Sequence, residues 1–171
     1  LIVGRGWGQG PTHSQNLQML FAGIPGLKVA IPSSPQDAYS QLRAAISSKD
    51  PIIFMEHRWL HGSSGNVEKK FNLSDLKEQV IIGNGNDYMI IASSYMVTEG
   101  LRSMALIKKN IGLNGMLINY RNYGEELTDN ELSLIAISKN LVIADTAQIG
   151  FTIAHKLTYQ VSAKLGYKIK Q

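Results

Sequence analysis

The sequence predicts an α/β fold made of two parallel-sheet units, each flanked by helices. Short apolar runs rich in β-branched residues alternate along the chain with segments whose apolar residues recur at helical spacing. The connections between successive apolar runs hold whole helices, which is too long for hairpins. Consecutive strands are therefore expected to run parallel, joined by right-handed crossovers.

The composition indicates a globular protein without membrane spans or thiol chemistry. Of the 171 residues, 44% are apolar and 18% are charged, which suits a folded domain rather than a disordered chain. No apolar run approaches the roughly 18–20 residues of a membrane helix. Cysteine is absent, so disulfides and thiolate metal sites are excluded. The net charge of +4 comes from scattered basic residues, which indicates a solvated surface and no nucleic-acid or membrane partner.

The first unit is predicted over residues 1–57. Its strands are the short apolar runs Leu1–Val3, Lys28–Ile31 and Pro51–Met55, and the last is continuously apolar, as strands of buried parallel sheets are. Between the first two strands, apolar residues of Ser14–Ile24 recur at helical spacing.

The second helix of this unit has a clear start. Ser34 is a predicted N-cap, Pro35 occupies the first helical position, and Asp37 lies in the first turn, where the helix dipole favours an acid. Apolar residues at helical spacing continue to about Ile46.

Residues 58–82 are predicted to be a linker that crosses the surface. They are polar through Gln79 and include the run Gly62–Asn66, which is typical of a loop.

The second unit is predicted over residues 83–171. Its strands are expected at Tyr88–Ala92, Met116–Asn119 and Leu141–Ala144, with another beginning at Tyr167–Lys170. Its helices are expected at Val97–Lys109, from the capping box at Thr128–Glu131 through Ile137, and at Ile149–Leu165.

Glycines alternate at the start of the chain, in the run GRGWGQG. A dinucleotide fingerprint would need a third glycine where Gln9 or Pro11 stands, and no Gly-Lys-Ser/Thr follows for a phosphate loop. Two readings stay open: a flexible connection between strand and helix, or a turn whose backbone approaches a ligand at the carboxyl end of a parallel strand.

His13 follows this turn in GPTHSQ, just before a predicted helix. A helix N-terminus disfavours imidazolium, so His13 is a candidate neutral base or donor, while a surface hydrogen bond is the alternative. We expect His57, His61 and His155 to be structural.

Residues 8–57 carry a succession of motifs: the glycine-rich turn, His-Ser-Gln, PGLKV, the helix start PSSPQDA, and Asp-Pro before a strand that ends in Glu. This succession resembles the late part of the pyrimidine-binding domain in beta subunits of thiamine-diphosphate-dependent 2-oxo acid dehydrogenases. From about Asn84 the chain is similar to the transketolase C-terminal domain. There Asn119-Tyr120-Arg121-Asn122 stands where the family usually has Asp-Leu-Arg-Thr, so Arg121 is kept.

The resemblance implies a partial thiamine-diphosphate-binding fold followed by a transketolase C-terminal-like domain. It implies oxidative decarboxylation of a 2-oxo acid on thiamine diphosphate with Mg²⁺, and acyl transfer to lipoyl groups. The family's active-site histidine maps onto His13, where it would steady a carbanion-like intermediate or shuttle a proton. The glutamate that activates the cofactor would lie outside this chain, before Leu1. Glu56 ends a strand beyond the motif and is expected to make a structural contact instead.

The resemblance also implies a potassium ion held by backbone carbonyls of Ala45, Ser48 and Asp50, since hard cations accept such oxygens. The alternative is a plain helix C-terminus with Lys49 near the negative end of the dipole.

The implied partners are an alpha subunit that holds the diphosphate, a second beta subunit, and the lipoyl acyltransferase component. The implied location is the bacterial cytoplasm or the mitochondrial matrix. Pyruvate, branched-chain and acetoin-type enzymes share this half-site, so the acyl chain stays open. A transketolase or deoxyxylulose-phosphate synthase fragment is one alternative, because both use a similar Gly-Pro-Thr-His turn, and a non-catalytic assembly subunit is another.

Overall fold

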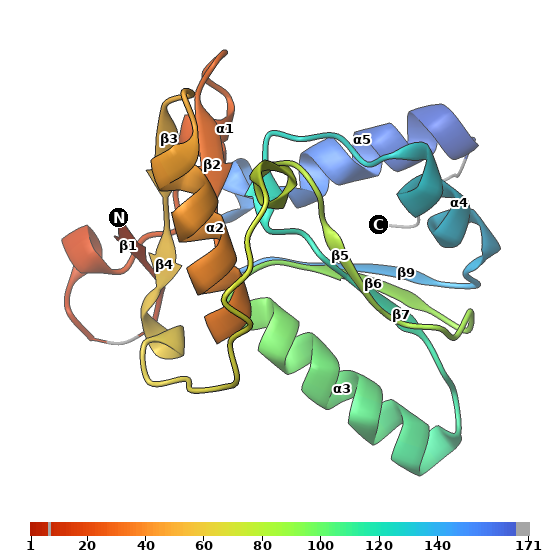
Figure 1. Ribbon diagram of the computed structural model, residues 1–171. Helices are drawn as coiled ribbons and strands as arrows, with labels where there is room; N and C mark the ends of the chain where they lie inside the picture. The colour runs from red at the N-terminus through yellow and green to blue at the C-terminus, as the bar shows by residue number, and fades with distance from the viewer. Residues whose placement is uncertain (7, 167–171) are drawn as a thin grey trace.

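A computed structural model describes residues 1–6 and 8–166, and in it helices pack around three small sheets (Figure 1). The strands are β1 (Ile2–Val3), β2 (Lys28–Ala30), β3 (Ile52–Phe54), β4 (Glu56–His57), β5 (Val80–Gly83), β6 (Met89–Ala92), β7 (Met116–Asn119), β8 (Asn122–Tyr123) and β9 (Leu141–Ala144). The α-helices are α1 (Gln18–Ala22), α2 (Pro35–Ser47), α3 (Tyr95–Ile111), α4 (Asp129–Ile137) and α5 (Ala154–Leu165). The 3₁₀ turns are η1 (Pro11–His13), η2 (Arg58–Leu60), η3 (Leu73–Leu76) and η4 (Ile149–Phe151).

The largest sheet has the strand order β5-β7-β6-β9 and is covered on both faces. Side chains of a strand alternate between the two faces of its sheet. Met89 and Ile91 of β6 accordingly share a core with Leu157 of α5, whereas Ile90 and Ala92 pack with α3. Figure 1 shows α4 and α5 on one side of this sheet and α3 on the other. This double coverage explains why the predicted strands are apolar throughout.

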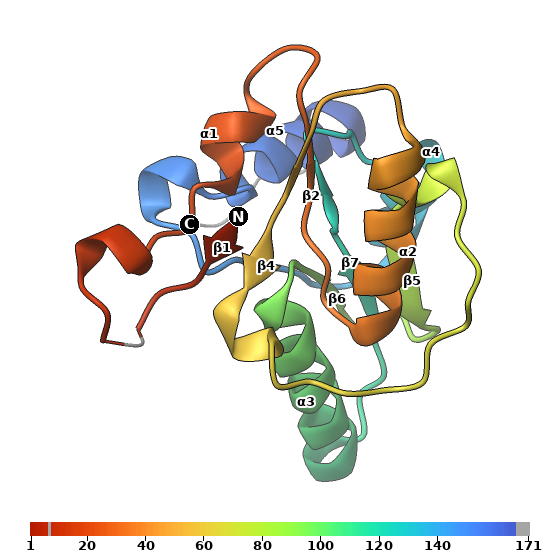
Figure 2. The ribbon, with the colours of Figure 1, turned by 60° about the vertical axis from the view of Figure 1, so that its left-hand side comes forward.

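The first part of the chain contributes two smaller sheets. β1 pairs in parallel with β4, and β2 pairs in parallel with β3. The free edge of β2 is closed by β8, which comes from the second half of the sequence. Figure 2 shows α2 beside β2, with the exposed segment 61–72 passing below α2 and rising beside it to η3. The two halves therefore share a sheet.

Two antiparallel pairings differ from the expectation that consecutive strands run parallel. β5 is antiparallel to β7, and β8 is antiparallel to β2. Neither β5 nor β8 was predicted as a strand. β5 is joined to β6 by residues 84–88 without a helix, and such a short connection reverses the chain direction. β8 pairs with a strand from the other half of the sequence, so no single crossover sets its direction. The expectation is correct for β6, β7 and β9, which are separated by helices and pair in parallel.

The predicted helix starts are confirmed at two places. The Ser34 hydroxyl accepts the Asp37 N–H, and Thr128 forms a reciprocal capping box with Glu131. The predicted helix Ile149–Leu165 is divided into η4 and α5. The strand predicted at Tyr167–Lys170 lies outside the described residues. Across the described part of the chain, no helix is long and apolar enough to cross a bilayer.

Candidate functional site

The glycine-rich turn follows β1 and is closed at its base. Gly6, Gly8 and Gly10 have φ between +74° and +81°, a region that side chains rarely adopt. A Cβ atom at any of these three positions would meet nothing within 4 Å, so the outer face of the turn is open. At the base, the Gly4 N–H donates to the Gln15 carbonyl at 3.1 Å. The turn can therefore be approached closely by another molecule while its ends stay fixed.

His13 is exposed at the end of η1, and its N–H donates to the Gly10 carbonyl at 3.3 Å. The prediction that it directly precedes a helix is wrong, because α1 begins only at Gln18. Two side-chain amides hold the intervening chain outside the helix: Gln15 donates to the Pro11 carbonyl at 2.9 Å, and Asn16 donates to the Thr146 carbonyl at 3.0 Å. Because α1 does not begin at His13, the dipole of α1 no longer supports the expectation of a neutral imidazole there.

His57 lies under the base of the same turn and is 2% exposed. Its Nδ1 accepts the Trp59 N–H at 3.3 Å, and its ring stacks on Tyr95 with 5.3 Å between centroids. Burial, followed by repulsion from His61, lowers the pKa of His57 to about 4, so the ring is neutral at neutral pH.

Glu56 and His61 lie on the outer side of β4 and η2. Their closest polar atoms are 3.7 Å apart, and both side chains are partly exposed. Together with His57 they line one end of a pocket of about 490 Å³ beside the start of α2. Glu56 thus contacts the segment that follows β4. In the described residues, no group of three or more His, Asp or Glu side chains could hold a metal ion.

The turn after α2 has bonds of its own. The Ala45 carbonyl accepts the Ser48 N–H at 3.2 Å, and the Ser48 hydroxyl accepts the Asp50 N–H at 3.1 Å. The Asp50 carboxylate pairs with the Lys28 ammonium at 2.7 Å, and this bond lowers the pKa of Asp50. The turn is thus a capped helix end with a cation already beside it.

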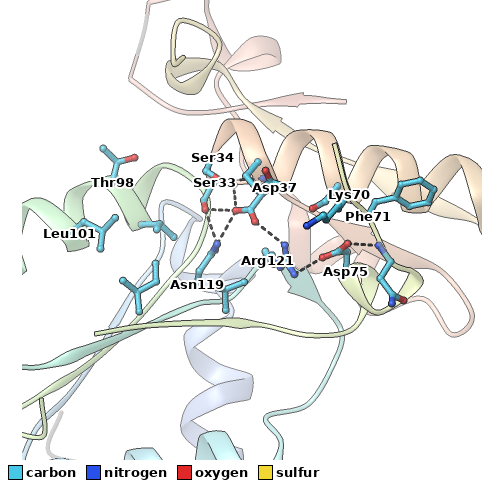
Figure 3. Close-up of a pocket in the computed structure, with 16 residues that line it drawn as sticks. Ser33, Ser34, Asp37, Lys70, Phe71, Asp75, Thr98, Leu101, Asn119 and Arg121 are labelled. Carbon is cyan, nitrogen blue, oxygen red and sulfur yellow. Dashed lines mark hydrogen bonds and ion pairs between the residues drawn. The ribbon is translucent and has the colours of Figure 1, made fainter. Parts of the chain in front are cut away.

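A buried charged cluster joins the two halves of the chain (Figure 3). The Asp37 carboxylate accepts from Arg121 at 2.8 Å, from the Ser33 hydroxyl at 2.7 Å and from the Asn119 amide at 2.9 Å. The other end of the Arg121 guanidinium pairs with Asp75 at 3.0 Å. We call Asp37, Arg121 and Asp75 the buried ion cluster; they come from α2, the segment between β7 and β8, and η3.

Electrostatics favour the charged form of this cluster. Burial alone would raise the pKa of Asp37, but the bond from Ser33, the charge of Arg121 and the bond from Asn119 outweigh it and lower the pKa below its usual value. A pocket of about 630 Å³ adjoins the cluster. Because the Asp37 and Arg121 charges are bonded to one another and to neighbours, the cluster fixes structure rather than offering a free charge to a ligand.

The part of the chain that holds the glycine-rich turn is similar to a known domain family. Residues 4–62 match the family model described as transketolase, pyrimidine binding domain. The chain is 34% identical over 161 residues to the beta subunit of acetoin:2,6-dichlorophenolindophenol oxidoreductase from Cupriavidus necator, covering 94% of this chain and 47% of that protein. It is 26% identical to the mitochondrial pyruvate dehydrogenase E1 beta subunit of Saccharomyces cerevisiae, covering 90% of this chain and 43% of the relative. The chain thus spans about half the length of the curated relatives it matches.

Solved structures agree on the fold. A split-gene transketolase, described as an inactive beta4 tetramer, superposes with a TM-score of 0.72 at 14% identity, covering 92% of this chain and 51% of that one. Transketolase from Campylobacter jejuni superposes with a TM-score of 0.58 at 12% identity, covering 97% and 31%. At these identities the likeness shows the fold: α/β, with parallel sheets and flanking helices, as in transketolases.

Proposed function

We propose, from its relation to pyruvate and acetoin dehydrogenase E1 beta subunits, that this chain is the beta-subunit portion of a 2-oxo acid dehydrogenase. The observation that carries the proposal is the match over 94% of the chain at 34% identity. The glycine-rich turn and exposed His13 lie within residues 4–62, which match the pyrimidine binding domain. Transketolase is less favoured, because the solved transketolases are only 12–15% identical. The proposed division is residues 1–57, a linker at 58–82, and residues 83–171.

The turn and His13 suit one side of a thiamine diphosphate site. The turn has an open outer face, so a cofactor or a partner subunit can reach its backbone. When bound, thiamine diphosphate supplies the electron sink for decarboxylation of a 2-oxo acid. This chain contributes one chemical role: the imidazole of His13 holds or moves a proton during acyl transfer to a lipoyl group. The activating glutamate is proposed to lie in a preceding segment, and Mg²⁺ and the diphosphate on an alpha subunit.

The chain alone is expected to bind thiamine diphosphate poorly, because the proposed site is split between subunits. Isothermal calorimetry of the 171-residue chain with cofactor and Mg²⁺ should give no binding tighter than about 10⁻⁴ M. The matched control is the full-length beta subunit assembled with its alpha subunit, which should bind. A dissociation constant on the order of micromolar for the chain alone would contradict the split site.

A potassium ion on the carbonyls of Ala45, Ser48 and Asp50 stays a proposal. The chemistry suits a hard cation, since a carbonyl oxygen that accepts one hydrogen bond keeps a second lone pair. The alternative is a capped helix end that binds no ion, in which Lys28 supplies the positive charge at Asp50.

Thermal unfolding in different salts separates these two accounts. An ion that binds only the folded state raises its stability, by about 2.7 kcal/mol at a hundred times its dissociation constant. We therefore expect a higher Tm in KCl than in NaCl or choline chloride at equal ionic strength. Equal Tm values in the three salts would contradict the potassium site and favour a capped helix end without a bound ion.

Partners and location follow from the same relation. We propose assembly with an alpha subunit, a second beta subunit and a lipoyl acyltransferase component. The proposed location is the bacterial cytoplasm or the mitochondrial matrix, because the matched relatives include bacterial and mitochondrial proteins.

A further inference from the structure

We propose that His57 is a positioning residue for the glycine-rich turn and hence for His13, joining the turn to the start of α3. The inference rests on the proposed function of His13 for its catalytic consequence, and on geometry alone for the contact itself. His57 lies at the end of the stretch that resembles the family, but the resemblance assigns it no role.

The first contact is between His57 and Gly4. A Cβ atom at Gly4 would lie 3.3 Å from Cε1 and 3.4 Å from Nε2 of the imidazole, so the ring lies directly against the glycine backbone. Gly4 also has φ of +137°, which disfavours any side chain there. Glycine at this position therefore lets the turn rest on the ring.

The same residues close the turn. Val3 pairs with His57 in the parallel β1–β4 ladder, and the next residue, Gly4, donates its N–H to Gln15. Both ends of the 4–15 segment are thus fixed where the imidazole packs. Residues 5–6 and 8–13, which include His13, are exposed, so the base is the packed part of the segment and controls where they lie.

The His57 ring is also supported from α3. Tyr95 stacks on His57 at an interplanar angle of 17°, and Trp59 packs edge-on against Tyr95 with 4.8 Å between centroids. The Tyr95 hydroxyl donates to Glu99 at 2.7 Å, and Glu99 pairs with Arg102, so α3 fixes the orientation of the tyrosine. The imidazole is therefore held between the turn and α3, and its neutral state suits a buried site.

Trypsin reports on this packing because Arg5 lies in the turn and is exposed, as is Gly6. Cleavage of a native protein tracks the population in which the segment is open. The measurement is the rate of Arg5–Gly6 cleavage in the 171-residue chain, followed by mass spectrometry of the quenched digest, with Tm measured in parallel. His57→Ala should raise this rate about tenfold or more, whereas His57→Phe, which keeps a flat ring on Gly4, should stay within about threefold.

His61→Ala is the matched control, because His61 lines the same pocket as His57, but the atoms nearest to a Cβ at Gly4 all belong to His57. Trypsin should cleave this variant at Arg5–Gly6 at the wild-type rate. Should His57→Ala fail to fold, Tyr95→Leu removes the outer support and is expected to raise cleavage at the same bond. Unchanged cleavage in His57→Ala, or in Tyr95→Leu as its substitute, would overturn the proposal, as would equal cleavage in the Phe and Ala variants.

Activity of the assembled enzyme then separates positioning from the proposed chemistry. His57→Ala is expected to lower kcat with little change in KM for the 2-oxo acid, and His57→Phe should restore most of kcat. If the turn opens in the trypsin assay while kcat stays at the wild-type value, the packing inference stands and the proposed role of His13 fails.

Discussion

Replacing His13 by alanine in the full-length assembled enzyme is expected to slow acyl transfer to lipoyl groups by about 10²–10⁴-fold, the usual effect of losing one acid–base group. The fold should not change, because His13 is exposed at the end of a three-residue 3₁₀ turn. The measurement is single-turnover acylation of a lipoyl domain by enzyme loaded with a 2-oxo acid.

His155→Ala is the matched control for this experiment. His155 is also exposed, but it lies on α5, in the other half of the chain. The enzyme carrying His155→Ala should transfer acyl groups at the wild-type rate. Wild-type turnover in His13→Ala would assign His13 to an ordinary surface hydrogen bond.

Arg121→Ala is expected to lower the free energy of unfolding by about 3–5 kcal/mol, because it leaves the buried Asp37 carboxylate without its cation. The side chains of Arg121 and Asp37 are each only 7% exposed, so the carboxylate left behind is largely shielded from water. Arg102→Ala is the control: its pair with Glu99 is also 2.8 Å long, but the Arg102 side chain is 64% exposed. Breaking that surface pair should cost less than about 1 kcal/mol.

The difference between Arg121→Ala and the wild type should depend on pH. The folded-state pKa of Asp37 is lowered, so its stabilisation is complete above the unfolded value of about 3.9 and is lost as the pH falls through the lower folded value. Urea unfolding at pH 7 should show the full difference, and the difference should shrink as the pH falls below the unfolded pKa of about 3.9. Equal urea midpoints for wild type and variant at pH 7 would show that the buried ion cluster does not hold the two halves of the chain together.

Local sequence signals predict the parts of the fold that local interactions decide. The α2 start at Ser34 and the capping box at Thr128 were predicted because each cap is a bond between neighbours in sequence. The α1 start was predicted too early, because apolar spacing suggested a helix where the bond from Asn16 to Thr146, 130 residues away, holds the chain outside it. β8 is only two residues long and is formed by pairing with β2, so it has no pattern of its own.

The candidate site shows the same difference between signals that are local in the sequence and contacts between distant residues. The glycine-rich turn and His13 were recognised because the motif is continuous in the sequence. The Asp37–Arg121 pair joins residues 84 positions apart, and no local pattern relates an acid in the first turn of α2 to an arginine after β7. His57 was expected to be structural, and its contact with Gly4 depends on the β1–β4 pairing, which the periodicity of two-residue strands does not reveal.

The most direct test of the proposed function is steady-state carbon dioxide release from 2-oxo acids by the full-length protein mixed with its alpha subunit, thiamine diphosphate, Mg²⁺ and an excess of oxidised lipoyl domain, which accepts the acyl group and the two electrons. We predict release that requires both subunits and that falls when His13 is replaced by alanine. No release with any 2-oxo acid from the mixed subunits, or undiminished release without the alpha subunit, would contradict the assignment of this chain to one half of a shared active site.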